Sequence, residues 1–145
     1  MNLTRVAYIV DDDDAVRDSF QILLEMLGIP IRAFASAEEF LAAWEPNWNG
    51  LVFLDLRMPG MGGFKMIEEL ERRGSRLAVA IISGHLDEER ISESSGSYPA
   101  TILEKPFEVE RLKDILRRYF DVPGLARTET NSEEDGEGSS SSADE

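Results

Sequence analysis

The chain has 145 residues, 42% of them hydrophobic, which is enough for one compact domain. It contains no cysteine, and this excludes a disulfide framework, thiolate metal ligands and a cysteine nucleophile. The net charge is -14, and residues 121–145 hold about half of it, with eight acidic residues against Arg127, so the remaining chain is acidic too and direct nucleic-acid binding is disfavoured.

No apolar run approaches the length of a membrane span, and the first residues lack the basic start and long apolar middle of a signal peptide. The absence of cysteine fits a reducing compartment. We therefore expect a cytoplasmic protein with no membrane partner.

The first half of the chain alternates between apolar runs and helical patterns. Residues 5–10, RVAYIV, predict a strand, and the apolar side chains of residues 16–28 recur at helical spacing up to a glycine. Residues 29–34 predict a second strand. Ser36 and Glu39 then stand in capping-box spacing at the start of a second helix.

The second half repeats this alternation. Residues 50–56 and 77–83 are apolar almost throughout, which suits central parallel strands covered on both faces. A helix that begins near Phe64 separates them, residues 100–104 form a shorter strand, and a last helix runs to Phe120. Alternating strands and helices with short joins predict a doubly wound parallel α/β sheet covered by helices.

One segment breaks the alternation. Between the fourth and fifth strands the chain offers only Leu86 and Ile91 as aliphatic anchors, so we expect the fourth helix to be weak or mobile. Near the end, the acidic, serine-rich stretch TETNSEEDGEGSSSSADE predicts disorder. We therefore expect one domain over residues 1–122 and a disordered acidic tail over residues 123–145.

Polar side chains follow the predicted strands at the ends where parallel α/β sheets place their sites. These residues are Asp11 and Asp12 after the first strand, Asp55 at the end of the third, Ser83 at the end of the fourth, and Lys105 after the fifth. Because neighbouring strands lie about 4.8 Å apart, these groups can converge on one rim of the sheet.

Carboxylates gathered in one place repel one another, and a hard divalent cation with oxygen ligands resolves that repulsion. Mg²⁺ prefers one or two carboxylates together with water and phosphate oxygens. An aspartate in such a position can also act as a nucleophile and form an aspartyl-phosphate. A lysine ammonium and a serine hydroxyl would then neutralise or hydrogen-bond the phosphoryl oxygens.

Four motifs in this order and spacing, IVDDDDAVR, LVFLDLRMPGMGG, AIISGH and LEKPF, resemble the receiver domain of two-component response regulators, in particular its FixJ-like branch. The resemblance spans about residues 5–120. It implies a flavodoxin-like and CheY-like fold, with a five-stranded parallel sheet of order 2-1-3-4-5 and flanking helices. It also implies a phosphoacceptor protein of a two-component or phosphorelay system, phosphorylated by a histidine kinase or a histidine phosphotransfer protein.

The resemblance assigns roles to the acidic residues and their neighbours. Asp55 would be the phosphoryl acceptor and a metal ligand. Asp12 would be a direct Mg²⁺ ligand, and Asp11 a ligand that acts largely through water. The backbone carbonyl of Arg57 would complete the protein's share of the metal shell.

Further roles follow from the same resemblance. Ser83 and Lys105 stand where the family carries the hydroxyl and the lysine that contact the phosphoryl group, and Pro106 stands where it carries a cis proline. His85 and Arg57 border the phosphoryl position in the family and can tune hydrolysis. Exposed loop residues without a catalytic duty explain these last two equally well.

The run of four aspartates then divides into two pairs. Asp11 and Asp12 face the metal. We expect Asp13 to stay in solvent and Asp14 to be the N-cap of the first helix, where a carboxylate oxygen accepts a hydrogen bond from an amide that has no partner within the helix.

Two features depart from the family. Ile102 stands where many receivers carry Phe or Tyr as part of a switch, and because it has no ring to rotate, we expect phosphorylation to order the loose fourth-helix segment and draw Ser83 toward the phosphate. The chain after Phe120 is too short and polar for a DNA-binding or enzymatic output domain. The sequence therefore predicts a stand-alone receiver that signals through protein contacts, with phosphotransfer and dephosphorylation at Asp55 as its chemistry.

Two other functions stay open. A small Mg²⁺-dependent phosphatase of the haloacid dehalogenase type uses an aspartate in a D-x-D-x-[TV] pattern, which residues 12–16 satisfy, although Asp55 would then have no role. A pseudo-receiver, which shares the architecture but never accepts phosphate, is the non-catalytic alternative, and Ile102 keeps it open.

Overall fold

The computed structural model describes residues 5–84 and 100–126, and within them five parallel strands form one sheet of order β2-β1-β3-β4-β5. The expected doubly wound α/β architecture is thus confirmed. The strands are β1 (Val6–Val10), β2 (Ile31–Phe34), β3 (Gly50–Asp55), β4 (Ala78–Ser83) and β5 (Ala100–Glu104). The helices are α1 (Asp14–Met26), α2 (Ala37–Ala43), α3 (Gly63–Arg72) and α5 (Val109–Arg117), followed by the 3-10 helix η2 (Pro123–Leu125).

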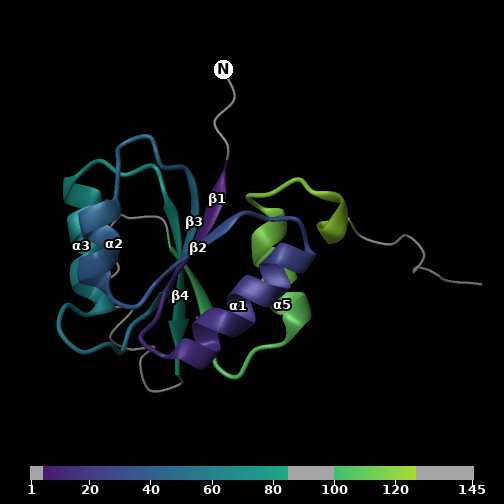
Figure 1. Ribbon diagram of the computed structural model, residues 1–145, viewed down its shortest axis with the longest axis horizontal. Coiled ribbons are helices and arrows are strands. Elements are labelled where there is room, and N and C mark those ends of the chain that lie inside the picture. The colour runs from purple at the N-terminus through teal and green to yellow at the C-terminus, as the bar shows by residue number, and fades with distance from the viewer. Residues whose placement is uncertain (1–4, 85–99, 127–145) are drawn as a thin grey trace, which may run out of the picture.

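Helices cover both faces of the sheet, with α1 and α5 on one face and α2 and α3 on the other (Figure 1). Ala7 and Ile9 of β1 belong to the core under α1 and α5, whereas Tyr8 and Val10 belong to the core under α2 and α3. Successive side chains of a strand point to opposite faces, so a sheet covered on both faces needs apolar residues at nearly every position. This is why β3 is buried along its whole length.

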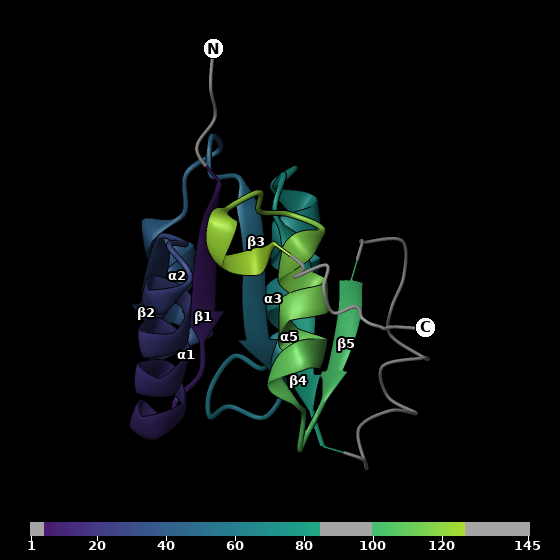
Figure 2. The same ribbon diagram turned by 90° about the vertical axis from the view of Figure 1, so that its right-hand side faces the viewer.

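The strands all run in one direction, so their carboxyl ends meet at one edge of the sheet (Figure 2). Asp55 of β3 lies opposite Ile82 of β4, and Ser83 of β4 lies opposite Glu104 of β5. The register therefore places the polar ends of these strands along one row.

The start of α1 differs from the sequence-based expectation. Asp13 is the N-cap, and its carboxylate accepts hydrogen bonds from the amides of Ala15 at 2.9 Å and Val16 at 3.4 Å. Asp14 is the first helical residue, is exposed, and forms an ion pair with Arg17. The expectation of Asp14 as the N-cap was wrong by one residue, because Asp13 holds the extended backbone conformation that a cap requires.

The packed chain continues beyond the last long helix. Leu125 of η2 is buried in the core under α1 and α5, and Arg117 donates a hydrogen bond of 2.8 Å to its carbonyl oxygen. The boundary expected between residues 122 and 123 therefore falls inside packed chain. Residues 127–145 and the expected fourth helix lie outside the described residues.

No helix within residues 5–84 and 100–126 combines the length and the apolar character that crossing a membrane requires.

Candidate functional site

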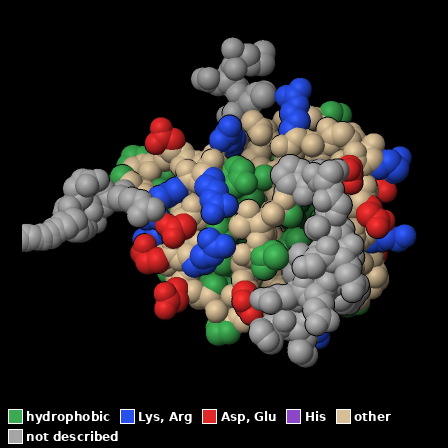
Figure 3. Space-filling model, turned by 180° about the vertical axis from the view of Figure 1, so that it is seen from behind, with side chains coloured by type: hydrophobic (Ala, Val, Ile, Leu, Met, Phe, Trp, Pro, Cys, Tyr) green, Lys and Arg blue, Asp and Glu red, His purple; other side chains and the backbone are tan. Residues whose placement is uncertain are grey.

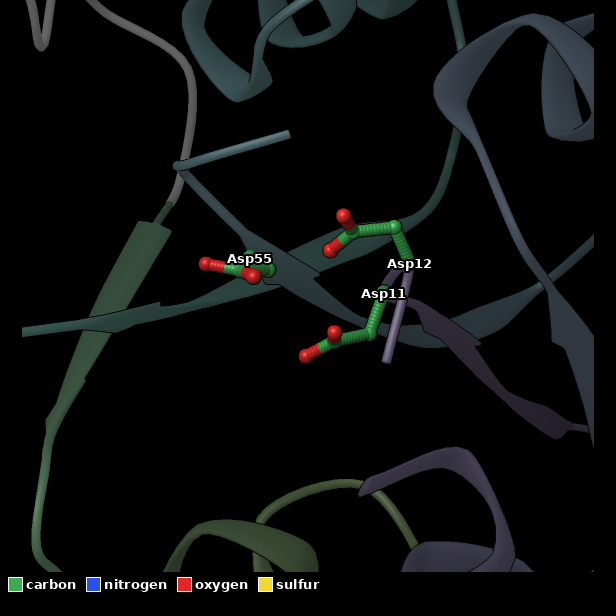
Figure 4. A group of neighbouring side chains, drawn as sticks. All are labelled: Asp11, Asp12 and Asp55. Carbon is green, nitrogen blue, oxygen red and sulfur yellow. The ribbon is translucent and has the colours of Figure 1, made fainter. Parts of the chain in front are cut away.

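Three carboxylates converge at the carboxyl ends of β1 and β3 (Figure 4). Asp11 and Asp12 follow β1 and Asp55 ends β3, and one carboxylate oxygen from each lies within 4.8 Å of the other two. Asp11 is 1% exposed and Asp55 is 8% exposed, whereas Asp12 is open to solvent. The pairing of two adjacent strands thus brings together the acidic residues that the sequence placed at separate strand ends.

Main-chain amides hold the two buried carboxylates. The amide of Asp13 donates to Asp11 Oδ1 at 2.9 Å, and the amide of Arg57 donates to Asp55 Oδ1 at 3.1 Å. In both cases the donor lies two residues further along the chain, in the turn that leaves the strand. Each turn therefore fixes the direction of the carboxylate that precedes it.

The environment of Asp11 is unfavourable for its charge. Burial raises the pKa of Asp11, the amide of Asp13 acts in the opposite direction, and the charge of Asp55 raises it further while Lys105 lowers it. Asp11 Oδ2 is buried and has no hydrogen-bond partner among the described residues. An unsatisfied buried acceptor costs about 1–3 kcal/mol, and a hard cation would remove that cost together with the repulsion. The donor set therefore fits a divalent metal ion with oxygen ligands.

Ser83 and Lys105 lie at the same edge of the sheet. Ser83 is 1% exposed, and its Oγ donates to the carbonyl oxygen of Gly84 at 3.0 Å. The Lys105 side chain is exposed and near enough to Asp11 for its charge to lower that pKa. The Lys105–Pro106 peptide bond is cis, as the resemblance implied.

The remaining predicted residues differ in how far the structure describes them. Ile102 is half-buried against the core under α2 and α3, opposite Ile81, and its carbonyl accepts a hydrogen bond of 3.3 Å from Arg111. His85 lies outside the described residues. The roles of Ile102, His85 and the Arg57 carbonyl stay predictions.

Two side chains that hydrogen-bond to the main chain of the segments after β1 and β3 were not predicted. Arg17 donates to the carbonyl oxygen of Asp11 at 2.7 Å while it pairs with Asp14. Its spacing of three from Asp14 on a helix was a usable signal in the sequence. Glu38 of α2 accepts a hydrogen bond of 2.9 Å from the amide of Met61, and no sequence pattern links two residues that far apart.

An apolar hollow of about 600 Å³ adjoins the site. It lies between the start of α1 and the loop after β5, and Val16, Phe20 and Phe107 contribute to its walls. Lys105 also lines it, so the hollow opens beside the rim that carries the carboxylates.

The comparisons with known proteins agree with this geometry. Residues 7–117 match the family model of the response regulator receiver domain. The chain is 41% identical over 101 residues to the transcriptional regulatory protein FixJ of Azorhizobium caulinodans, a match that covers 70% of this chain and 48% of that protein. It is 34% identical over 119 residues to the tetrathionate response regulatory protein TtrR of Salmonella typhimurium, covering 82% of this chain and 58% of that protein.

A solved structure is similar as well. The crystal structure of FixJ-N aligns with a TM-score of 0.71 and 32% identity, over 79% of this chain and 91% of that one. The chain spans about half the length of the curated relatives it matches. Because the family model covers most of the chain and the strand order, the acidic edge and the relatives all agree with it, this protein belongs to the response regulator receiver domain family, in its FixJ-like branch.

Proposed function

We propose that this protein accepts a phosphoryl group on Asp55 from a histidine kinase or a histidine phosphotransfer protein, with Mg²⁺ held by Asp11, Asp12, Asp55 and the carbonyl of Arg57. One observation carries the proposal. The three carboxylates lie within 4.8 Å of one another, and one buried oxygen of Asp11 has no hydrogen-bond partner among the described residues. Such an arrangement is unfavourable without a cation and favourable with one.

The chemistry is a transfer between two protein side chains. The P–N bond of a donor phosphohistidine breaks as a P–O bond forms to a carboxylate oxygen of Asp55. Mg²⁺, when bound, offsets the negative charge of the carboxylates and of the phosphoryl oxygens. Lys105 supplies a further positive charge at the rim. Ser83 would have to turn its hydroxyl away from the Gly84 carbonyl to reach a phosphoryl oxygen. The output would then run through this movement of Ser83, because Ile102 has no ring to rotate.

The donor protein would approach over the apolar hollow beside Lys105. A partner that buries the hollow's apolar walls, including Val16 and Phe107, would bring its own phosphohistidine next to Asp55. The hollow would then supply affinity, while the acidic edge supplies the chemistry.

The face on the β5 side supports a protein as the downstream partner. Lys and Arg side chains gather there with Asp and Glu beside them (Figure 3). On α5, Arg117 pairs with Asp114 at 2.6 Å and Lys113 with Glu110 at 3.8 Å. Because charges of both signs alternate there and the whole chain carries a net charge of -14, a polyanion such as DNA is a poor partner for this face. A cytoplasmic location stays a prediction.

The test is incubation with acetyl phosphate and Mg²⁺, followed by the mass of the intact protein. We expect one phosphoryl adduct, which is absent with EDTA and absent in Asp55→Asn. A protein that forms no adduct and binds no Mg²⁺ would instead be a pseudo-receiver. An Asp55→Asn variant that still hydrolyses a phosphate monoester would indicate the dehalogenase-type phosphatase.

A further inference from the structure

Glu38 joins α2 to the loop that follows the candidate phosphoacceptor. Its Oε2 accepts a hydrogen bond of 2.9 Å from the amide of Met61, which lies 23 residues further along the chain. The amides of Met61 and of Glu38 itself both lower the pKa of this carboxyl. The side chain is exposed, yet it is held from two sides, by its own helix and by the loop.

The loop backbone passes close to this carboxylate. Residues 57–62 lie in the loop that connects β3 to α3 and include Gly60, whose φ of 77° is a conformation that glycine adopts readily. A Cβ on Gly60 would lie 2.7 Å from Glu38 Oε2. The N-cap of α3 is Gly62, which makes no side-chain capping bond. An external acceptor on α2 therefore restrains a stretch of backbone that contains two glycines.

The same loop begins at the site. The amide of Arg57 donates to Asp55 Oδ1 at 3.1 Å, and the carbonyl of Arg57 is the proposed main-chain metal ligand. At the base of the loop, the amide of Gly63 donates to the carbonyl of Leu56 at 3.4 Å. Only three residues lie between Arg57 and Met61, so a shift at the Met61 amide would be passed to the Arg57 amide that orients Asp55.

The neighbouring glutamate has a different task. The Glu39 carboxylate accepts from the amide of Ala35 at 3.1 Å, and the Glu39 amide donates to Ser36 Oγ at 3.1 Å. These contacts stay at the N-terminal end of α2. Glu38 and Glu39 are thus adjacent exposed residues of equal charge, and of the two only Glu38 reaches the loop in the contacts that the described residues make.

We propose that Glu38 is a positioning residue for the acidic site. By accepting from Met61 it holds the loop of residues 57–62 in the conformation that presents the Arg57 amide to Asp55 and the Arg57 carbonyl to the metal. The inference rests on the proposed function, and it assigns the residue an effect through the loop, since Glu38 is outside the group of three converging carboxylates.

The test compares four substitutions in the full chain: Glu38→Ala, Glu38→Asp, Glu38→Gln and Glu39→Ala. Three quantities are measured for each, namely the Kd for Mg²⁺ by calorimetry, hydrogen exchange of the loop amides, and the midpoint of thermal unfolding. Glu38→Ala should weaken Mg²⁺ binding by about 5-fold or more, the lower end of typical coupling between sites, and should speed exchange of the loop amides.

The other three variants distinguish the reach of the side chain at position 38 from its charge and from the stability of α2. Glu38→Asp keeps the charge on a side chain that is one methylene shorter, so it should lose affinity as Glu38→Ala does. Glu38→Gln keeps an oxygen acceptor at the same reach and should stay near the wild-type affinity. Glu39→Ala should lower the thermal midpoint through the cap of α2 and leave the Mg²⁺ affinity unchanged.

Failure of the inference is distinguishable from failure of the proposed function. A wild-type protein that binds no Mg²⁺ and takes no phosphoryl group would overturn both. A wild-type protein that does both, with Glu38→Ala and Glu38→Asp matching its Mg²⁺ affinity and loop exchange, would overturn the positioning role alone. Equal losses of affinity in Glu38→Ala and Glu39→Ala would also overturn it, because they would reduce the effect to the stability of α2.

Discussion

The main-chain amide of Lys105 donates a hydrogen bond of 2.7 Å to the carbonyl oxygen of Ser83. This bond continues the β4–β5 ladder beyond the pair Ser83 and Glu104. It places the lysine beside the end of β4 and on the edge that carries Asp11 and Asp55. Main-chain pairing between β4 and β5 therefore sets the positions of Ser83 and Lys105, the two residues expected to contact a phosphoryl group.

Replacing Asp55 with Asn should abolish the phosphoryl adduct and stabilise the metal-free protein. One of three carboxylates within 4.8 Å then loses its charge, while the amide oxygen can still accept from Arg57. We expect the free energy of unfolding to rise by about 1 kcal/mol without metal, the repulsion of one like-charge pair about 4 Å apart at the dielectric of water. Urea unfolding in EDTA measures this change.

The matched control for that substitution is Asp18→Asn, on the exposed surface of α1. It removes a carboxylate outside the cluster and should leave both the adduct and the stability near wild type. If the two variants change stability equally, the repulsion assigned to the cluster is absent.

Replacing Lys105 with Met should have opposite effects on metal binding and on phosphoryl transfer. The positive charge that lowers the pKa of Asp11 disappears, so the carboxylates should bind Mg²⁺ slightly more tightly. Adduct formation from acetyl phosphate should slow by about 10- to 100-fold, the value of one charge-assisted hydrogen bond. Mass spectrometry of samples quenched at set times gives the rate of adduct formation, and calorimetry gives the affinity for Mg²⁺.

Lys65→Met on the exposed surface of α3 is the control for charge alone. It should change neither the affinity for Mg²⁺ nor the rate of adduct formation. A Lys105→Met variant that forms the adduct at the wild-type rate would remove Lys105 from the proposed chemistry.

Replacing Asp13 with Ala should destabilise the protein by about 1 kcal/mol, because the amides of Ala15 and Val16 lose their acceptor. Asp14→Ala removes an exposed ion pair with Arg17 and should cost about 0.5 kcal/mol or less. Chemical denaturation of the two variants distinguishes the residues. The opposite ranking would restore Asp14 as the N-cap.

Tyr8 should make the protein lose stability in alkaline solution. Burial raises the pKa of Tyr8 to about 12, with the charge of Arg32 acting in the opposite direction. Between its usual value of about 10 and that raised value, the unfolded chain loses the phenolic proton first, so stability falls as the pH rises through this window. At about pH 11 the loss from this group should be about 1.4 kcal/mol.

Tyr8→Phe removes the phenol and with it this contribution to the loss of stability at high pH. The difference in unfolding free energy between about pH 9 and about pH 11 should therefore be smaller in the variant than in the wild type by that amount. Equal differences in the two proteins would show that the phenol titrates at its ordinary pKa.

The first helix shows where prediction from sequence was limited. Its apolar spacing predicted the helix, and Phe20 and Leu24 are indeed buried. The identity of the cap among four consecutive aspartates was wrong by one residue, since a cap is selected by backbone angles that neighbouring identical residues do not reveal. The contact of Arg17 with the Asp11 carbonyl likewise depends on the angle at which α1 leaves β1.

The sequence by itself determined the parallel sheet, the two covered faces and the edge at which the acidic residues gather. Long apolar runs require burial on both faces, and charged residues directly after buried strands can only lie at the strand ends. The tertiary structure alone decided that Asp11 Oδ2 lacks a donor among residues 5–84 and 100–126, and that within them Glu38 reaches the loop after Asp55 while Glu39 contacts the start of α2. Those outcomes depend on distances of a few ångströms between segments far apart in the chain, and no local pattern of residue types encodes such distances.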